Sequence, residues 1–185
     1  IETYFARFGT LVSESKRQCD LLVLNPVESV WAIAHLGWAN WIFSADRNVD
    51  LLQTHYENVF KMLEGAHIDF DYGEEQMLAE MWSIGNDEKG RAILTLGEAS
   101  YHTVLVSGML TIRSTTLSVL RRFAAAGGRV LFTEDIPEYV DARKSEEAQL
   151  LASDCTVVKF DEASVSSAVL RGSEFCVSLS DGECE

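Results

Sequence analysis

Residues 101–133, YHTVLVSGMLTIRSTTLSVLRRFAAAGGRVLFT, hold the strand–helix–strand pattern that decides the fold. The run 102–107 is apolar without alternation, which is typical of a strand buried on both faces of a parallel sheet. A helix is predicted over 114–126, and Gly127 and Gly128 end it. Residues 129–133 follow at once as the next strand. Strands that alternate with helices in this way predict an α/β protein with a mostly parallel sheet.

The alternation continues on both sides of this unit. Further strands are predicted over 20–25, 67–72, 91–96, 155–160 and 174–179, and further helices over 2–18, 29–43, 48–64, 74–82, 145–152 and 164–171. The strand at 91–96 is expected to pair with 81–84 across an NDEKG turn.

Right-handed crossovers leave few ways to connect these elements. We predict a three-layer, flavodoxin-like fold with a mostly parallel sheet of about five strands in the order 2-1-3-4-5. The expected sheet core is the set of apolar residues in the three central strands: Leu22, Val23, Leu24, Val104, Leu105, Val106, Val130 and Leu131. One domain is expected over 1–172, and residues 173–185 are expected to form a terminal strand or to begin a following module.

The balance of charge argues against two classes of partner. The 185 residues include 29 acidic and 15 basic side chains, for a formal charge of −14. A nucleic-acid binder needs a basic stripe, and an anionic membrane repels such a chain, so neither partner is expected. No apolar run approaches the roughly 18 residues of a spanning helix. Because the first residue is Ile1 rather than Met, we expect a piece of a longer chain.

The motifs of cofactor and metal sites are missing from the sequence. No GxGxxG follows the first strand and no GxxxxGK[ST] occurs, so no nucleotide cofactor is expected. The cysteines Cys19, Cys155, Cys176 and Cys184 form no CxxC pair, which disfavours zinc and favours free thiols in a reducing, cytoplasmic compartment. His67, Asp69 and Asp71 alternate along one strand and could hold a divalent ion, but a solvated strand end explains them better, so no metal is predicted.

Ligands of open α/β sheets bind at the carboxyl ends of the strands. The predicted strands place there a set of mostly polar residues, which we take as a candidate pocket: Asn25, Glu28, Ser29, Asp69, Asp71, Gly108 and Glu134. We identify no catalytic residue. Ser107 ends a strand, but no histidine that would activate it can be identified from the sequence, and the many carboxylates cannot be paired.

Trp31, Trp38 and Trp41 fall on one face of the helix predicted over 29–43. Such a face suits either the domain's own core or a contact with another subunit or module, since tryptophan is enriched in binding hot spots. The two alternatives remain open, and the three indoles are candidate interface residues.

Three segments carry a resemblance to a known family. They are YFARFGTLVSESKRQCDLLVLNPVESVWA at 4–32, HIDFDYG at 67–73 and the stretch 101–128. In their order and spacing they resemble the glutamine-amidotransferase-like domain of multidomain bacterial glycoside hydrolases. That domain is similar to the β-galactosidase trimerisation domain and to its counterpart in α-L-rhamnosidase-like enzymes. The resemblance covers roughly residues 2–140.

The resemblance implies a class I glutamine-amidotransferase-like domain that follows a catalytic barrel and precedes β-sandwich modules. The glycosidase carboxylates of such enzymes lie in the barrel. Amidotransferase relatives use a cysteine at a strand–helix elbow, where this chain reads Ser107-Gly108-Met109. The expectation is therefore a non-catalytic structural or assembly domain of a glycoside hydrolase acting on plant or microbial polysaccharide glycosides. Its partners would be the neighbouring modules and further copies of the chain.

Two other functions fit the residues. One is a stand-alone sugar-binding module in which an indole stacks on a sugar ring. The other is a hydrolase that uses the acidic carboxyl edge of the sheet.

Overall fold

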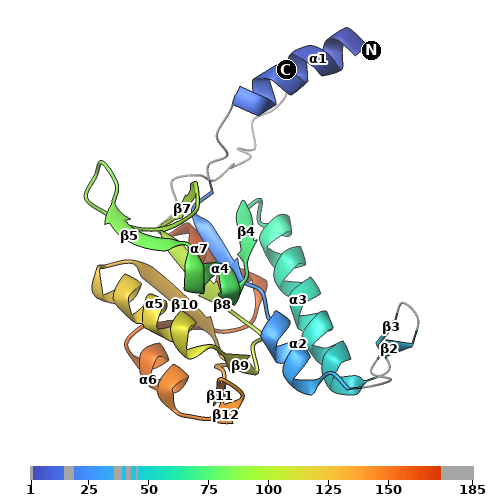
Figure 1. Ribbon diagram of the computed structural model, residues 1–185, viewed down its shortest axis with the longest axis vertical. Coiled ribbons are helices and arrows are strands. Elements are labelled where there is room, and N and C mark those ends of the chain that lie inside the picture. The colour runs from blue at the N-terminus through green and yellow to red at the C-terminus, as the bar shows by residue number, and fades with distance from the viewer. Residues whose placement is uncertain (1, 15–18, 36–38, 41–42, 45, 172–185) are drawn as a thin grey trace.

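The computed structural model describes residues 2–14, 19–35, 39–40, 43–44 and 46–171 (Figure 1). The helices are α1 (Glu2–Glu14), α2 (Val27–Ile33), α3 (Arg47–Gly65), α4 (Glu75–Glu80), α5 (Ser114–Ala125), α6 (Glu147–Ser153) and α7 (Glu162–Leu170). The longer strands are β1 (Leu21–Leu24), β4 (Phe70–Gly73), β5 (Trp82–Asn86), β6 (Ala92–Leu96), β8 (Thr103–Val106) and β10 (Arg129–Thr133). The shorter ones are β2 (Ala39–Asn40), β3 (Phe43–Ser44), β7 (Ala99–Tyr101), β9 (Thr111–Ile112), β11 (Tyr139–Val140), β12 (Arg143–Lys144) and β13 (Thr156–Val158).

The central sheet has five strands in the order β13-β10-β8-β1-β4, and all its pairings are parallel. Counted along the chain, these strands give the predicted order 2-1-3-4-5. The layout is consistent with a flavodoxin-like fold. The physical reason for this order was already given by the sequence pattern. Each crossover helix returns the chain to the start of the next parallel strand, and helices must cover both apolar faces of the sheet.

Helices cover the two faces of the sheet in separate layers (Figure 1). One core packs Leu22, Val104 and Phe132 against α5 and α6. The other packs alternate residues of the same strands, such as Leu105, against α3 and α7. All eight residues predicted for the sheet core are buried, which confirms that prediction.

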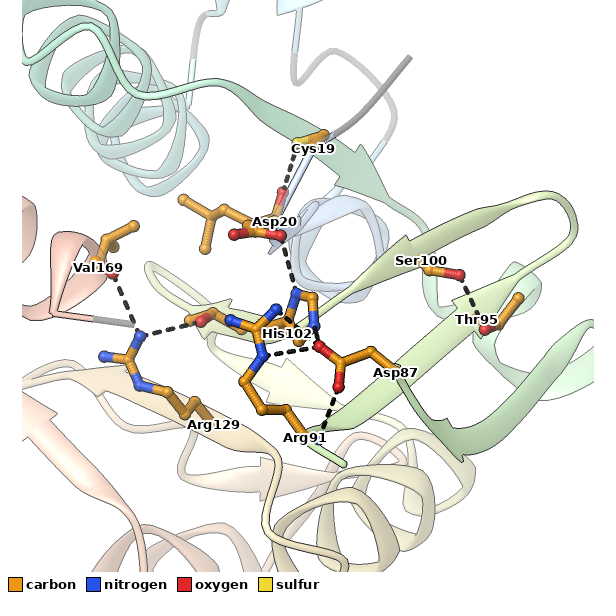
Figure 2. A network of polar contacts seen from close by, with 11 residues as sticks. Cys19, Asp20, Asp87, Arg91, Thr95, Ser100, His102, Arg129 and Val169 are labelled. Carbon is orange, nitrogen blue, oxygen red and sulfur yellow. Dashed lines mark hydrogen bonds and ion pairs between the residues drawn. The ribbon is translucent and has the colours of Figure 1, made fainter. Parts of the chain in front are cut away.

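A small antiparallel sheet, β5-β6-β7, packs on the face covered by α5. The β5–β6 hairpin was predicted, whereas β7 was not. A network of polar contacts fixes this sheet to the amino edge of the central one (Figure 2). The two ring nitrogens of His102 lie 2.8 Å from Asp20 Oδ1 and 3.1 Å from Asp87 Oδ2. Arg91 binds Asp87 in turn, at 2.7 Å. Since His102 and Asp20 are largely buried, we interpret this cluster as a structural ion-pair network that links the small sheet to the central one.

The N-terminal helix stands apart from these layers. Figure 1 shows α1 projecting beyond the end of the central sheet at which β1 begins. Every residue from 2 to 13 is exposed, including an apolar face formed by Tyr4, Phe5, Phe8, Leu11 and Val12.

The helix predicted over 29–43 is confirmed only in its first part. The helix α2 ends at Ile33, and β2 and β3 then pair as antiparallel strands. Glycine, asparagine and aromatic residues lower the helix propensity of the stretch after Ile33, which is the physical reason for the early end of the helix. Trp31 is 65% exposed on α2, while Trp38 and Trp41 lie outside the described residues.

The strand predicted over 67–72 begins later, at Phe70. His67 has a φ of 54°, a left-handed turn that follows α3, so the extended backbone starts after it. The strand predicted over 174–179, with Cys176, Cys184 and the segment 173–185, lies outside the described residues.

Candidate functional site

Three connections meet at the carboxyl edge of the sheet. The helix α2 follows β1, β9 follows β8, and the β11–β12 hairpin follows β10 (Figure 1). The strands β9 and β11 pair with each other, with Thr111 opposite Tyr139. The order of the central sheet reverses between β1 and β8, and such a switch point is where open α/β sheets bind ligands.

Ser29, a predicted pocket residue, holds two of these connections together. Its hydroxyl accepts hydrogen bonds from the amides of Leu110 (2.9 Å) and Thr111 (3.1 Å) and donates one to the Thr111 carbonyl (3.2 Å). The side chain is fully buried. Ser29 therefore positions the wall of the site instead of facing a ligand.

A cavity of about 550 Å³ lies at the switch point, and we call it the Trp31 cavity. It is lined by Glu28 and Trp31 from α2, by Arg113 and Thr115 at the start of α5, and by Asp141 from the β11–β12 turn. Trp31 presents an exposed indole among charged and hydroxyl side chains. The cavity thus combines an aromatic surface with several hydrogen-bonding groups.

Arg113 is fixed by partners from two other elements. Its guanidinium pairs with Glu28 and donates to Gln76 Oε1 at 2.6 Å. Its backbone amide donates to Glu75 Oε2 at 2.7 Å, and burial raises the pKa of the Glu75 carboxyl. Because Glu28 is engaged with Arg113, it is not a free general acid or base in this arrangement.

Another part of the cavity wall is built from a strained turn. Asp141 and Ala142 have φ values of 49° and 59°, the left-handed region that β-hairpin turns usually fill with Asn-Gly. Their amides donate to the Ile112 carbonyl and to Thr111 Oγ1, both at 3.0 Å. These bonds place Asp141 Oδ1 3.0 Å from the amide of Ser114, where it caps α5 and where that bond lowers the pKa of Asp141.

A second cavity, of about 430 Å³, opens on the same edge between α3 and the segments after β8 and β10. His55 from α3 reaches into this region. Its Nε2 lies 2.8 Å from Ser107 Oγ, and its Nδ1 lies 3.6 Å from Asp135 Oδ2. Burial lowers the pKa of His55, partly opposed by Asp135, so the imidazole is neutral at neutral pH.

The His55 ring packs closely against two neighbours. It stacks on Phe160 with ring centroids 3.8 Å apart. It also lies close to Gly108, whose φ is +63° and where an added Cβ would come 2.2 Å from His55 Cδ2. Gly108, a predicted pocket residue, is therefore needed for the close approach of the imidazole.

Ser107, His55 and Asp135 have the order of a nucleophile, a base and an orienting acid, but the arrangement does not suit catalysis. Ser107 is only 3% exposed and does not line the cavity. Its oxygen also accepts a hydrogen bond from Thr133 at 3.0 Å. Since a serine nucleophile must reach the substrate's carbonyl carbon, we interpret this cluster as a buried polar network.

The remaining predicted pocket residues are spread over several places. Asn25 follows β1 at the carboxyl edge, and its backbone amide donates a hydrogen bond to the Gly73 carbonyl at 3.0 Å. Glu134 follows β10 and is exposed. Asp69 precedes β4 and Asp71 is its second residue, so their placement at the carboxyl edge is wrong. Because β4 starts later than predicted, both line a different hollow beside α3, where Asp71 accepts a bond from Tyr101.

Of the predicted candidates, the structure brings Glu28 and Trp31 together in one cavity, with Ser29 behind its wall. Sequence reasoning missed Arg113, Asp141 and the pairing of His55 with Ser107. No local pattern marks these residues. Arg113 and His55 have partners more than 50 positions away in the chain, and Asp141 lies in a turn that contains no glycine. Within the described ranges, no group of three or more histidine, cysteine or acidic side chains could hold a metal ion.

No described helix is both long and apolar enough to cross a membrane. No protein-family model matches the chain, and no curated protein matches it either.

Proposed function

We propose that this chain is a non-catalytic assembly domain of a larger glycoside hydrolase, with an amidotransferase-like variant of the flavodoxin-like fold. The strand order and the resemblance of 4–32, 67–73 and 101–128 support this assignment. The segment that would correspond to the amidotransferase elbow reads Ser107-Gly108-Met109, without a cysteine, and Ser107 is buried and hydrogen-bonded to His55.

The observation that carries the proposal is the exposed apolar face of α1. The side chains of this face are 54% to 72% exposed: Tyr4, Phe5, Phe8 and Leu11. Full burial of one large apolar side chain would stabilise the protein by about 1.5–3 kcal/mol, so this face leaves a considerable free energy unused. Isolated helices shorter than about 12–15 residues are marginal in water, even in alanine-rich sequences. A 13-residue helix with this face is therefore expected to pack against another protein surface.

The partner that we propose is the catalytic module of a second copy of the same longer chain, so that the contact joins two subunits. The test begins with the gene, whose reading frame should encode a glycosidase module beside this domain. In the full-length protein, the double variant Phe5→Ser/Leu11→Ser should weaken assembly, measured as molar mass by light scattering. Leu51→Ser, which changes a 57% exposed residue on α3, is the matched control and should leave assembly unchanged.

Activity measurements provide an independent check. The isolated chain should not turn over a panel of nitrophenyl glycosides. Turnover that survives purification and disappears in Glu28→Gln or Asp71→Asn would refute a non-catalytic role. A reading frame without a catalytic module would refute the glycosidase assignment, and an unchanged mass of the α1 variant would refute the docking role of α1.

A further inference from the structure

We propose that the Trp31 cavity is a binding site for a neutral saccharide, with Trp31 as the surface on which one sugar ring stacks. This inference rests on the proposed function only for its choice of ligand family. The cavity lies at the carboxyl edge of the sheet and α1 at the opposite end, so the two proposals can fail separately (Figure 1).

The first argument is the exposed indole. Trp31 is 65% exposed and forms part of a cavity of about 550 Å³, in the size range of small-molecule sites. A large aromatic face left in water favours an occupant with an apolar face of its own. The C–H face of a pyranose ring has this character, and its rim of hydroxyl groups needs polar partners.

The second argument is the set of polar groups around the indole. Glu28, Arg113, Asp141 and Thr115 supply carboxylate acceptors, guanidinium donors and a hydroxyl that does both. Sugar hydroxyls both donate and accept, and charged groups make the stronger hydrogen bonds to them. The contacts of Arg113 with Glu28 and Gln76 hold these side chains in place before a ligand arrives.

The third argument is the balance of charge, which selects a neutral ligand. Glu28 is paired with Arg113, and the positive charges of Arg113 and Arg143 act on Asp141. The amide of Ser114 at the start of α5 is already capped by Asp141, and the amide of Arg113 is bonded to Glu75. The donors that an anion would need at this helix start are therefore occupied.

The fourth argument is the strain in the wall of the cavity. Two consecutive non-glycine residues, Asp141 and Ala142, are held in the left-handed region by bonds to Ile112 and Thr111. Such strain is found where the surrounding structure determines a conformation, often at binding sites. Here its effect is to fix the Asp141 carboxylate at the rim of the cavity.

The test is a titration of the folded chain with neutral methyl glycosides of hexoses, 6-deoxyhexoses and pentoses. Saturation-transfer NMR detects binding and calorimetry gives affinity. At least one glycoside should bind, and Trp31→Ala should weaken it tenfold or more, which corresponds to about 1.4 kcal/mol. Trp31→Phe should retain part of the affinity because it keeps a ring. Phe60→Ala, which changes an exposed ring on α3, should have no effect.

Urea unfolding should show that each variant remains folded. Binding of inorganic phosphate in place of the glycosides would overturn the proposal and make the cavity an anion site. Absence of binding across the panel would overturn it as well. If Trp31→Ala lowers the molar mass of the full-length assembly without changing glycoside binding, Trp31 is an interface residue and the saccharide site is refuted.

Discussion

Replacing Gly108 by alanine tests the close packing of His55 at the carboxyl edge. The substitution carries two costs. Gly108 has a φ of +63°, where an L-residue is disfavoured by about 1–2 kcal/mol. Its new Cβ would also lie 2.2 Å from His55 Cδ2, and overpacking of this kind costs about 1–3 kcal/mol.

His55 cannot simply move aside, because it stacks on Phe160 and is hydrogen-bonded to Ser107. We therefore expect Gly108→Ala to reduce the free energy of unfolding by about 2–5 kcal/mol. The matched control is Gly97→Ala. Gly97 has a φ of +60° and open space around its Cβ position, so only the cost of about 1–2 kcal/mol should remain.

The assay is urea unfolding, with the slope of the free energy against denaturant checked for constancy. A double-mutant cycle isolates the contact: in a His55→Ala background, Gly108→Ala should cost only what Gly97→Ala costs. The packing argument is refuted if Gly108→Ala and Gly97→Ala cost the same in the native background, or if removing the imidazole does not lower the cost of Gly108→Ala.

Two further predictions concern the core and the pH dependence of stability. Leu105→Ala should lower the free energy of unfolding by about 2–5 kcal/mol, because Leu105 is fully buried in the central strand β8. Val157→Ala, on the exposed edge strand, is the control and should lower it far less. A decrease below about 1 kcal/mol for Leu105→Ala on urea unfolding would contradict the core assignment. Stability should fall as the pH is lowered through 6.5, the ordinary pKa of histidine, since burial lowers the pKa of His55 and the unfolded chain therefore takes up its proton first. His55→Gln should have a shallower pH dependence than the parent in that window, and identical slopes would show that His55 makes no contribution.

The order of the central sheet was predictable from local pattern. Continuous apolar runs at 20–25, 102–107 and 129–133 indicate strands buried on both faces, and glycines mark the ends of the helices between them. Once the strands alternate with helices, the handedness of crossovers restricts the topology. The buried residues Leu22, Val104 and Val130 follow directly from this reasoning.

The periodicity of the tryptophans gave a wrong prediction for a physical reason. A spacing of i, i+7 and i+10 is compatible with a helix, but it does not require one, and the stretch contains residues with low helix propensity. The choice between a continuing helix and the β2–β3 pairing depends on contacts beyond the local sequence. The placement of Asp69 and Asp71 failed similarly, because a left-handed turn at His67 delayed the strand.

The sequence by itself determined which residues follow the strands of the sheet at its carboxyl edge, because parallel strands all end on one side and their connections collect there. Only the tertiary structure decided which residues meet at that edge. Arg113 reaches Glu28 across 85 positions of the chain, and His55 reaches Ser107 across 52. Such pairs leave no local signal, since each depends on the packing of elements that are neighbours in space and distant in sequence.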